Sequence, residues 1–247
     1  MGFILLLLVI VLAVYSLNEQ GFFKIDTIEI TARTPASQKN YIASKVKQLQ
    51  LKLNSFKGIP LWKAPLSQIS KALSEEKWIK KFQISRAWPA GIVLNIEPDL
   101  IGLVVIPQDT WRASTGQVTE VRPVTQSGNV LEKVKSSEAP DAMVTYDSAF
   151  LNNSKLRETA MGVLNSLPKK GSMSAGRISE IGYDKKEGYW VKLLQSETKI
   201  NFGEDQFEIK SARISQVIDY LESRNLEARV IDANLSKKVL VRLRQNP

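Results

Sequence analysis

Two pairs of carboxylates are the residues of this sequence best suited to chemistry. Asp184 with Glu187 and Glu204 with Asp205 could supply a general acid and a general base, or oxygen ligands for a metal ion. Both pairs fall at turns between periodic segments. The chain also contains no His and no Cys, which removes imidazole bases, thiolate nucleophiles and the common zinc ligands. Solvated turn residues are therefore the favoured interpretation, and we expect no catalytic residue, no cofactor and no metal.

A serine and a lysine at helical spacing offer a second route to catalysis. Ser67 and Lys71 lie four residues apart in an amphipathic segment, where both would occupy the polar face of a helix. No glycine-rich phosphate-binding loop accompanies them. We interpret the pair as solvent-facing helix residues.

Three tryptophans could stack on a ligand instead. Trp78, Trp88 and Trp190 each lie in or beside a segment of alternating apolar and polar residues. Because such segments form half-buried strands, positions in the core are favoured over ligand contacts for all three.

The composition predicts a folded protein with a basic surface. The chain has 247 residues, of which 43% are hydrophobic and 24% charged, enough for one large or two small domains. Its 34 Lys and Arg against 25 Asp and Glu give a net charge of +9. The basic residues are scattered and never form a run of five, so a nucleic-acid partner is disfavoured.

The first seventeen residues, Met1 to Leu17, carry no charged side chain. As a helix they would measure about 25 Å, close to the roughly 30 Å hydrocarbon core of a bilayer. A cleaved signal peptide is disfavoured because a basic start and a small-residue cleavage site are missing. We therefore expect an uncleaved transmembrane anchor at 1–21. Lys24 and Arg33 after it oppose a cytoplasmic N-terminus, a conflict that a basic segment upstream of Met1 would remove.

The next 75 residues predict the order β-α-α-β-β. Apolar and polar residues alternate in three segments that we expect to be strands, 23–31, 80–88 and 92–97. Pro89-Ala90-Gly91 predicts a tight turn between the last two. Apolar residues spaced by three and four predict a helix from Ser37 to Leu53 and a shorter one after Pro65. Such a unit covers one sheet face with helices and leaves its edges to a partner.

The remaining chain predicts a second β-rich unit. Short strands are expected at 100–107, 110–111 with 116–118, and 143–146, and a polar exposed loop at 124–140. A helix from Leu156 to Leu167 precedes strands at 178–183, 189–194 and 198–202. A helix from Ile209 to Leu221 and strands at 228–232 and 238–243 complete the pattern.

Several of these segments resemble one known family. The pattern F-x-I-x-x-I-x-I from Phe23 to Ile30, Trp78-Ile79, R-x-W-P from Arg86 to Pro89, and L-x-I-x-E-P from Leu94 to Pro98 are similar to the POTRA domain of the FtsQ/DivIB bacterial cell-division proteins. The run from Tyr189 to Gly203, Val230-Ile231-Asp232 and the last strand are similar to the C-terminal β domain of that family. The middle third departs from the family pattern, because its turn and Leu-Pro motifs match loosely or are absent.

The resemblance implies a fold class and three regions. The fold class is α+β: an N-terminal transmembrane helix, a POTRA-like β-α-α-β-β domain, and a mixed β-sheet domain with flanking helices. The anchor is expected at 1–21, the POTRA-like domain at 22–98 and the FtsQ-type β domain at 99–247. The resemblance also implies an inner-membrane protein with its bulk in the periplasm, located at the division septum.

The last strand is the most informative candidate for a binding site. A strand close to a chain end often forms a sheet edge, whose free N–H and C=O groups can pair with a strand of another protein. Flanking lysines and arginines favour an acidic partner. An internal strand with solvated cations is the alternative on the pattern alone.

Family resemblance favours the open edge and names its partners. FtsQ/DivIB proteins bind the division proteins FtsB and FtsL through the last strand and the helix before it. The partner-binding residues implied here are Arg213, Leu235, Lys237, Lys238, Val239, Leu240, Val241 and Arg242. The protein is then a divisome scaffold that controls septal peptidoglycan synthesis by binding. The alternative is a membrane-anchored periplasmic cell-wall enzyme with a POTRA-like accessory domain, which a cleft with buried convergent polar groups would favour.

Overall fold

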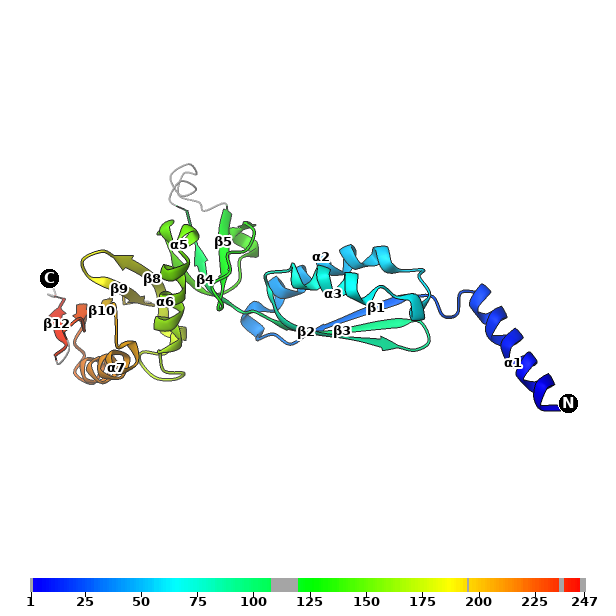
Figure 1. Ribbon diagram of the computed structural model, residues 1–247. Coiled ribbons are helices and arrows are strands. Elements are labelled where there is room, and N and C mark those ends of the chain that lie inside the picture. Colours follow the sequence, from blue (N-terminus) through cyan, green and yellow to red (C-terminus); the bar gives the residue numbers. More distant parts are fainter. Residues whose placement is uncertain (1, 108–119, 195, 236–237, 245–247) are drawn as a thin grey trace. The chain divides into compact units, whose positions relative to one another are not determined.

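The computed structural model describes residues 2–107, 120–194, 196–235 and 238–244 (Figure 1). By their contacts the residues form two units, Met1–Leu100 and Ile101–Pro247, and each is treated by itself below. The assignment of 22–98 to a POTRA-like domain and of 99–247 to an FtsQ-type β domain stays a prediction.

The expected transmembrane anchor at 1–21 is wrong. The segment does form a helix, α1 (Gly2–Glu19), but none of the helices in the described part of the chain is long and apolar enough to cross a membrane. The 18 residues of α1 measure about 27 Å, against a hydrocarbon core of about 30 Å. Its last two residues, Asn18 and Glu19, are polar, which shortens the apolar part further.

Unit 1 has a three-stranded sheet with two helices on one face (Figure 1). The elements follow in the predicted order: β1 (Thr27–Ala32), α2 (Lys39–Leu53), α3 (Leu66–Ser74), β2 (Ile79–Ala87) and β3 (Gly91–Pro98). The sheet order is β1-β3-β2, with β1 parallel and β2 antiparallel to the central β3. Alternate residues of β3, namely Ile92, Leu94 and Ile96, are buried, because the period of two turns them all towards the helices.

Unit 2 is built on one mixed sheet of nine strands in the part of the chain that the structure describes. The strand order is β12-β11-β10-β9-β8-β7-β4-β5-β6. The strands are β4 (Ile101–Val105), β5 (Glu120–Thr125), β6 (Val134–Lys135), β7 (Met143–Thr145), β8 (Ile178–Asp184), β9 (Gly188–Leu193), β10 (Lys199–Gly203), β11 (Ala228–Asp232) and β12 (Leu240–Leu243). The last described strand of the chain, β12, therefore lies at one edge of the sheet.

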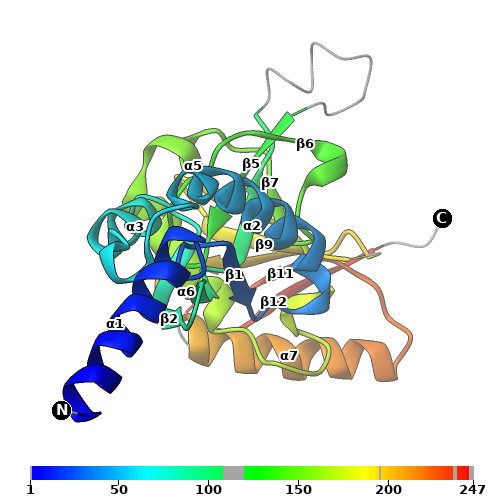
Figure 2. The same cartoon turned by 90° about the vertical axis from the view of Figure 1, so that its right-hand side faces the viewer.

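In the described part of unit 2, three α-helices pack against this sheet: α5 (Ala149–Asn152), α6 (Ser154–Asn165) and α7 (Phe207–Ser223). Ala160 and Val163 of α6 and Ile214 and Ile218 of α7 are buried in one core with residues of the sheet such as Val191. Figure 2 shows α7 running alongside β11 and β12. This helix follows β10 and precedes β11, so it connects two parallel neighbouring strands.

Two expectations for the middle of the chain need comment. The expected strand material at 110–111 and 116–118 lies outside the described residues. The exposed loop expected at 124–140 is wrong in part, because β5 extends to Thr125 and β6 occupies Val134–Lys135. Val121 and Val124 of β5 are buried, which accounts for the ordered pairing of a segment whose polar residues suggested a loop.

Candidate functional site

The strand β12 forms one edge of the nine-stranded sheet. It pairs antiparallel with β11, with Ile231 opposite Val241 and Asp232 opposite Leu240. Among the described residues no strand pairs with its other side. Short, paired on one side and open on the other, β12 has the geometry that accepts an added strand.

The direction of the free backbone groups follows from one hydrogen bond. The Arg244 N–H donates to the Glu227 carbonyl at 2.8 Å, so it points towards β11. Because N–H directions alternate along a strand, the N–H groups of Arg242 and Leu240 also point towards β11. Those of Val241 and Leu243 then point to the open edge, where another chain can reach them.

A groove runs between this edge and α7. It has a volume of about 570 Å³. Its walls come from the helix, from the turn after it and from alternate positions of the last strand region: Arg213, Gln216, Val217, Tyr220, Leu221, Leu226, Val239, Val241 and Leu243. The lining is mainly apolar, with one guanidinium at the Arg213 position. We name it the α7–β12 groove.

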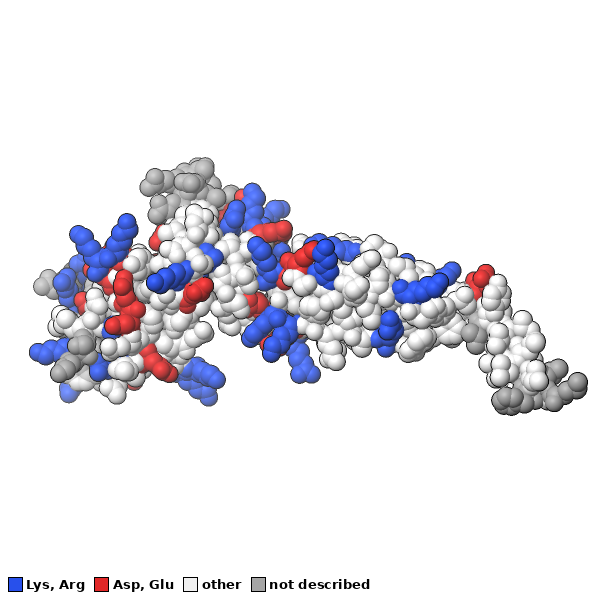
Figure 3. Space-filling view, viewed as in Figure 1, with Lys and Arg blue, Asp and Glu red and all other residues white. Residues whose placement is uncertain are grey.

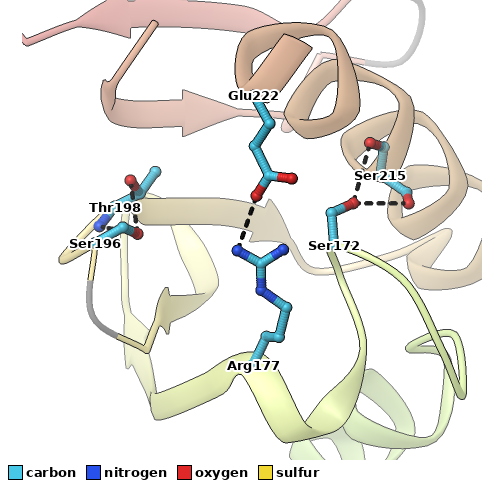
Figure 4. Close-up of polar contacts among 6 residues, drawn as sticks. All are labelled: Ser172, Arg177, Ser196, Thr198, Ser215 and Glu222. Carbon is cyan, nitrogen blue, oxygen red and sulfur yellow. Dashed lines mark hydrogen bonds and ion pairs between the residues drawn. The ribbon is translucent and has the colours of Figure 1, made fainter. Parts of the chain in front are cut away.

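Polar contacts near the C-terminal end and near the middle of α7 fix the helix that forms one wall of the groove. The Arg177 guanidinium, just before β8, donates to the Glu222 carboxylate of α7 at 2.8 Å. Near the middle of α7 the Ser172 and Ser215 hydroxyls lie 3.3 Å apart (Figure 4). The wall is therefore anchored to the preceding segment of the same unit by side chains as well as by its buried apolar face.

The other face of β12 is polar. Leu240 and Arg242 line a smaller pocket of about 120 Å³ together with Lys199, Asn201 and Asp232. The Asn201 side chain is buried and its Oδ1 has no hydrogen-bond partner. A strand added to β12 would thus meet apolar side chains on the α7 side and charged ones on the other.

The structure brings some of the predicted binding residues together and separates others. Arg213, Val239 and Val241 line the α7–β12 groove, whereas Leu240 and Arg242 face the opposite side of the sheet. Leu235 and Lys238 are exposed in the segment between β11 and β12. Lys237 lies outside the described residues. Whether any of these residues contacts a partner stays a prediction.

Sequence reasoning missed much of the helical wall. Gln216, Val217 and Tyr220 line the groove with Arg213, because positions three, four and seven residues apart lie on one face of a helix. That spacing was visible in the sequence. Leu226 and Leu243 had no comparable signal, since they join the groove only through the folding of the chain.

The first acidic candidate pair serves the turn between β8 and β9. The Asp184 carboxylate accepts hydrogen bonds from the N–H groups of Lys186 at 2.7 Å and Glu187 at 3.1 Å. These bonds lower the pKa of Asp184 below its ordinary value. Glu187 pairs with Lys199 at 2.7 Å. Each carboxylate therefore has a structural contact, and the two do not converge on a common ligand position.

The second acidic pair is divided between two different contacts. Glu204 accepts a hydrogen bond from the Tyr183 hydroxyl at 2.9 Å, which raises the pKa of Tyr183 because the phenolate would lose that bond. Asp205 accepts from the buried Lys210 ammonium at 2.8 Å.

The core residue Tyr189 also has a shifted pKa. Burial raises the pKa of its hydroxyl, which donates a hydrogen bond to the Leu156 carbonyl.

The other catalytic candidates show no convergent geometry either. Ser67 and Lys71 are both exposed on α3, as their spacing predicted. Within the described residues no group of three His, Cys, Asp or Glu could hold a metal ion. What the unit does offer is an open strand beside an apolar groove, an arrangement that can bind a polypeptide segment.

Trp78, Trp88 and Trp190 occupy three different environments. Trp78 is buried, and its indole N–H donates to Glu76 at 2.9 Å. Trp190 is half-buried, with its ring over Gly182 and near the ammonium groups of Lys192 and Lys199. The prediction of a core position for Trp88 is wrong, because this side chain is 62% exposed in the turn between β2 and β3.

Comparison with known proteins gives one family. The family model described as "Cell division protein FtsQ/DivIB, C-terminal" matches residues 110–234. The matched segment includes α7 and β11 and ends before β12. No curated protein matches the chain.

Proposed function

The chain belongs to the FtsQ/DivIB family of cell-division proteins, and we propose that it binds the periplasmic segments of FtsB and FtsL at the α7–β12 groove. Membership of the family gives the protein a role in cell division, and the family is one of non-catalytic division scaffolds. The named partners, FtsB and FtsL, and their binding site on this chain are our proposal in addition to that family role. The observation that carries them is the open edge of β12 beside an apolar groove.

The mechanism we propose is strand addition. A segment of FtsB pairs with the outward N–H and C=O groups of Val241 and Leu243, so that its backbone extends the sheet by one strand. Its side chains on the α7 side fill the groove beside Val217 and Tyr220. Main-chain bonds supply much of the affinity and the groove selects the side chains.

Charge supplies the orientation of the partner. Arg213 lies at the helical wall of the groove, and Arg242 and Lys238 are exposed on and before β12. Acidic residues in the partner segment would pair with these cations, and such pairs favour encounter and register more than affinity. FtsL is held through FtsB in this proposal, and the captured pair brings septal peptidoglycan synthesis under divisome control.

Unit 1 has a separate role in the proposal. We assign it as the POTRA-like domain, which in this family is associated with recruitment to the division site. Its strand β2 has an open edge among the described residues, and we expect β2 and the neighbouring α3 to contact earlier division proteins. The protein then acts at the division septum.

A proline in β12 tests the strand-addition mechanism. Val241→Pro removes an outward N–H donor while leaving the N–H groups that face β11 in place. We expect the dissociation constant for the FtsB periplasmic segment to rise about tenfold or more, because an unmade interface hydrogen bond costs about 1–3 kcal/mol. The measurement is a titration of the full-length protein with that segment.

The matched control is Val134→Pro in β6, at the opposite edge of the same sheet. It makes the same substitution in an edge strand and should leave binding unchanged. Thermal unfolding of both variants shows whether the fold persists. Undiminished binding by a folded Val241→Pro protein would exclude strand addition at β12.

A further inference from the structure

Four aromatic side chains gather at one end of unit 1. The ring centroids of Phe22 and Phe23 lie 5.2 Å apart, and Phe23 lies 5.6 Å from Trp62 and 6.3 Å from Trp88. Phe22, Trp62 and Trp88 are 51%, 44% and 62% exposed. We call these four residues the aromatic tip. Large aromatic side chains normally bury most of their surface, so a cluster this exposed indicates a binding surface.

The backbone holds the tip in place before any partner arrives. The Leu61 N–H donates to the Phe23 carbonyl at 2.8 Å, which joins the segment before β1 to the Trp62 segment. The Asp26 N–H donates to the Ala90 carbonyl at 2.9 Å, which joins it to the β2–β3 turn that carries Trp88. Three separate segments thus form one surface, and little ordering is needed when it binds.

Basic side chains lie on or next to the segments that form the tip. The charged residues on or beside its segments are Lys24, Lys57, Lys63 and Arg86, with Glu19 and Asp26 as the acidic ones, and all six are exposed. The tip begins three residues after the end of α1. A hydrogen bond joins the two, because the Phe22 N–H donates to the Leu17 carbonyl at 3.0 Å. Figure 3 shows the part of the chain that α1 occupies in Figure 1 almost without charged side chains.

We propose that the aromatic tip binds an anionic lipid surface. Tryptophan favours the headgroup region of a bilayer, where its ring is in an apolar phase and its N–H stays hydrated. Lysine and arginine around it reach anionic headgroups while their stems cover apolar surface. The lipid surface then holds unit 1 by the end at which β1 begins.

Two features favour lipid over a protein partner. The tip combines exposed Trp and Phe with a cationic rim, which is the composition of segments that lie at a membrane interface. It is also continuous in sequence with α1, whose described side chains from Ile4 to Leu12 are apolar and exposed. Phe22 follows three residues after α1, so a lipid surface that contacts those side chains can also contact Phe22.

The experiment uses a fluorescent label on the full-length protein. Because the chain has no cysteine, one introduced cysteine takes an environment-sensitive dye specifically. Lys63→Cys places the dye beside Trp62; it removes one basic side chain of the tip and keeps Lys24, Lys57 and Arg86. Lys77→Cys makes the same exchange at an exposed lysine near the start of β2, about 30 Å away along a strand of nine residues. The probe is vesicles of phosphatidylcholine and phosphatidylglycerol.

We expect the dye at position 63 to shift its emission to the blue on these vesicles, and the dye at position 77 to show no shift. Vesicles of phosphatidylcholine alone should give a smaller shift at position 63. An equal shift on both kinds of vesicle would overturn the choice of an anionic surface. No shift at position 63, or equal shifts at positions 63 and 77, would overturn binding by the tip.

Substitution of the aromatic side chains separates the tip from α1. Trp62→Ser with Trp88→Ser leaves α1 unchanged and should abolish the shift at position 63. Trp62→Phe with Trp88→Phe keeps two aromatic rings and should retain it, which controls for misfolding. A shift that persists in the serine variant would overturn the proposal. A shift that needs high protein concentration and no vesicles would overturn it too, by showing that a second copy covers the tip.

Discussion

Lys210 shows how one buried charge can position a binding surface. The side chain is only 3% exposed, and its ammonium donates to the Phe202 carbonyl and to the Asp205 carboxylate, both at 2.8 Å. A cation near the N-terminal end of α7 opposes the helix dipole, so its place depends on these two acceptors. Lys210 therefore ties the end of β10 to α7, which carries one wall of the α7–β12 groove.

Replacing this lysine should lower stability. Lys210→Met keeps much of the side-chain volume but removes the donor from the Phe202 carbonyl, so we expect the free energy of unfolding to fall by about 1–3 kcal/mol. Urea denaturation measures it. Lys170→Met, at an exposed position, is the matched control and should change little. Equal stability of the two variants would show that the Lys210 contacts contribute nothing net.

At this scale the sequence predicted positions better than environments. Arg213 was expected at a partner-binding surface from the family resemblance, and Val241 from its place in the last strand. Both line the α7–β12 groove, and their contact with a partner stays a prediction. Trp88 was expected in a core, since it flanks an alternating strand, yet the turn at Pro89 carries its ring out to solvent. Whether a residue beside a turn faces inward depends on the turn geometry and not on the alternation before it.

The elements α7 and β12 share the groove, but they contribute differently to it. The strand offers backbone groups and the side chains of Val239, Val241 and Leu243, whereas α7 offers the half-buried Val217 and the exposed Tyr220. Tyr220 is 58% exposed, so it contributes little to the core. A large exposed aromatic beside an open strand is typical of residues that dominate binding energy.

Truncation of this tyrosine should weaken binding without unfolding the protein. For Tyr220→Ala we expect the dissociation constant for the FtsB segment to rise about tenfold or more, as for a binding hot spot. Stability should change by less than about 0.5 kcal/mol, because the side chain is exposed. Ile209→Ala alters another exposed residue of α7 that does not line the groove, and should leave both quantities unchanged. Equal binding by the two variants would contradict the assignment of the helical wall.

At the scale of elements, strong periodicity predicted helices and strands correctly but did not predict where each strand begins and ends. The expected strands at 178–183, 189–194 and 198–202 correspond to β8, β9 and β10, since buried residues such as Ile181 and Val191 alternate along them. The last strand begins at Leu240 and not at 238, as local pattern does not determine where pairing with β11 starts. The groove forms only where α7 packs beside β12, and no local sequence pattern predicts that these two elements are neighbours.

At the scale of the whole molecule, the two proposed surfaces belong to different units. The aromatic tip lies within Met1–Leu100 and the α7–β12 groove within Ile101–Pro247, and each has its own sheet. The net charge of +9 suits both proposed partners, an anionic lipid surface and an acidic segment. Sequence pattern alone predicted two units but could not distinguish these surfaces, because both depend on which side chains the fold leaves exposed.

We predict that the two surfaces bind independently. Sites in separate units with no shared residues should show additive effects, so Trp62→Ser with Trp88→Ser should leave the affinity for the FtsB segment unchanged. Val241→Pro should likewise leave the dye shift at position 63 unchanged on vesicles. The combined variant should lose both activities by the amounts seen separately, measured by the same titration and the same fluorescence shift. If the tip variant instead bound the FtsB segment more weakly at unchanged stability, lipid and partner binding would be coupled through the chain, and neither surface could be treated as a separate module.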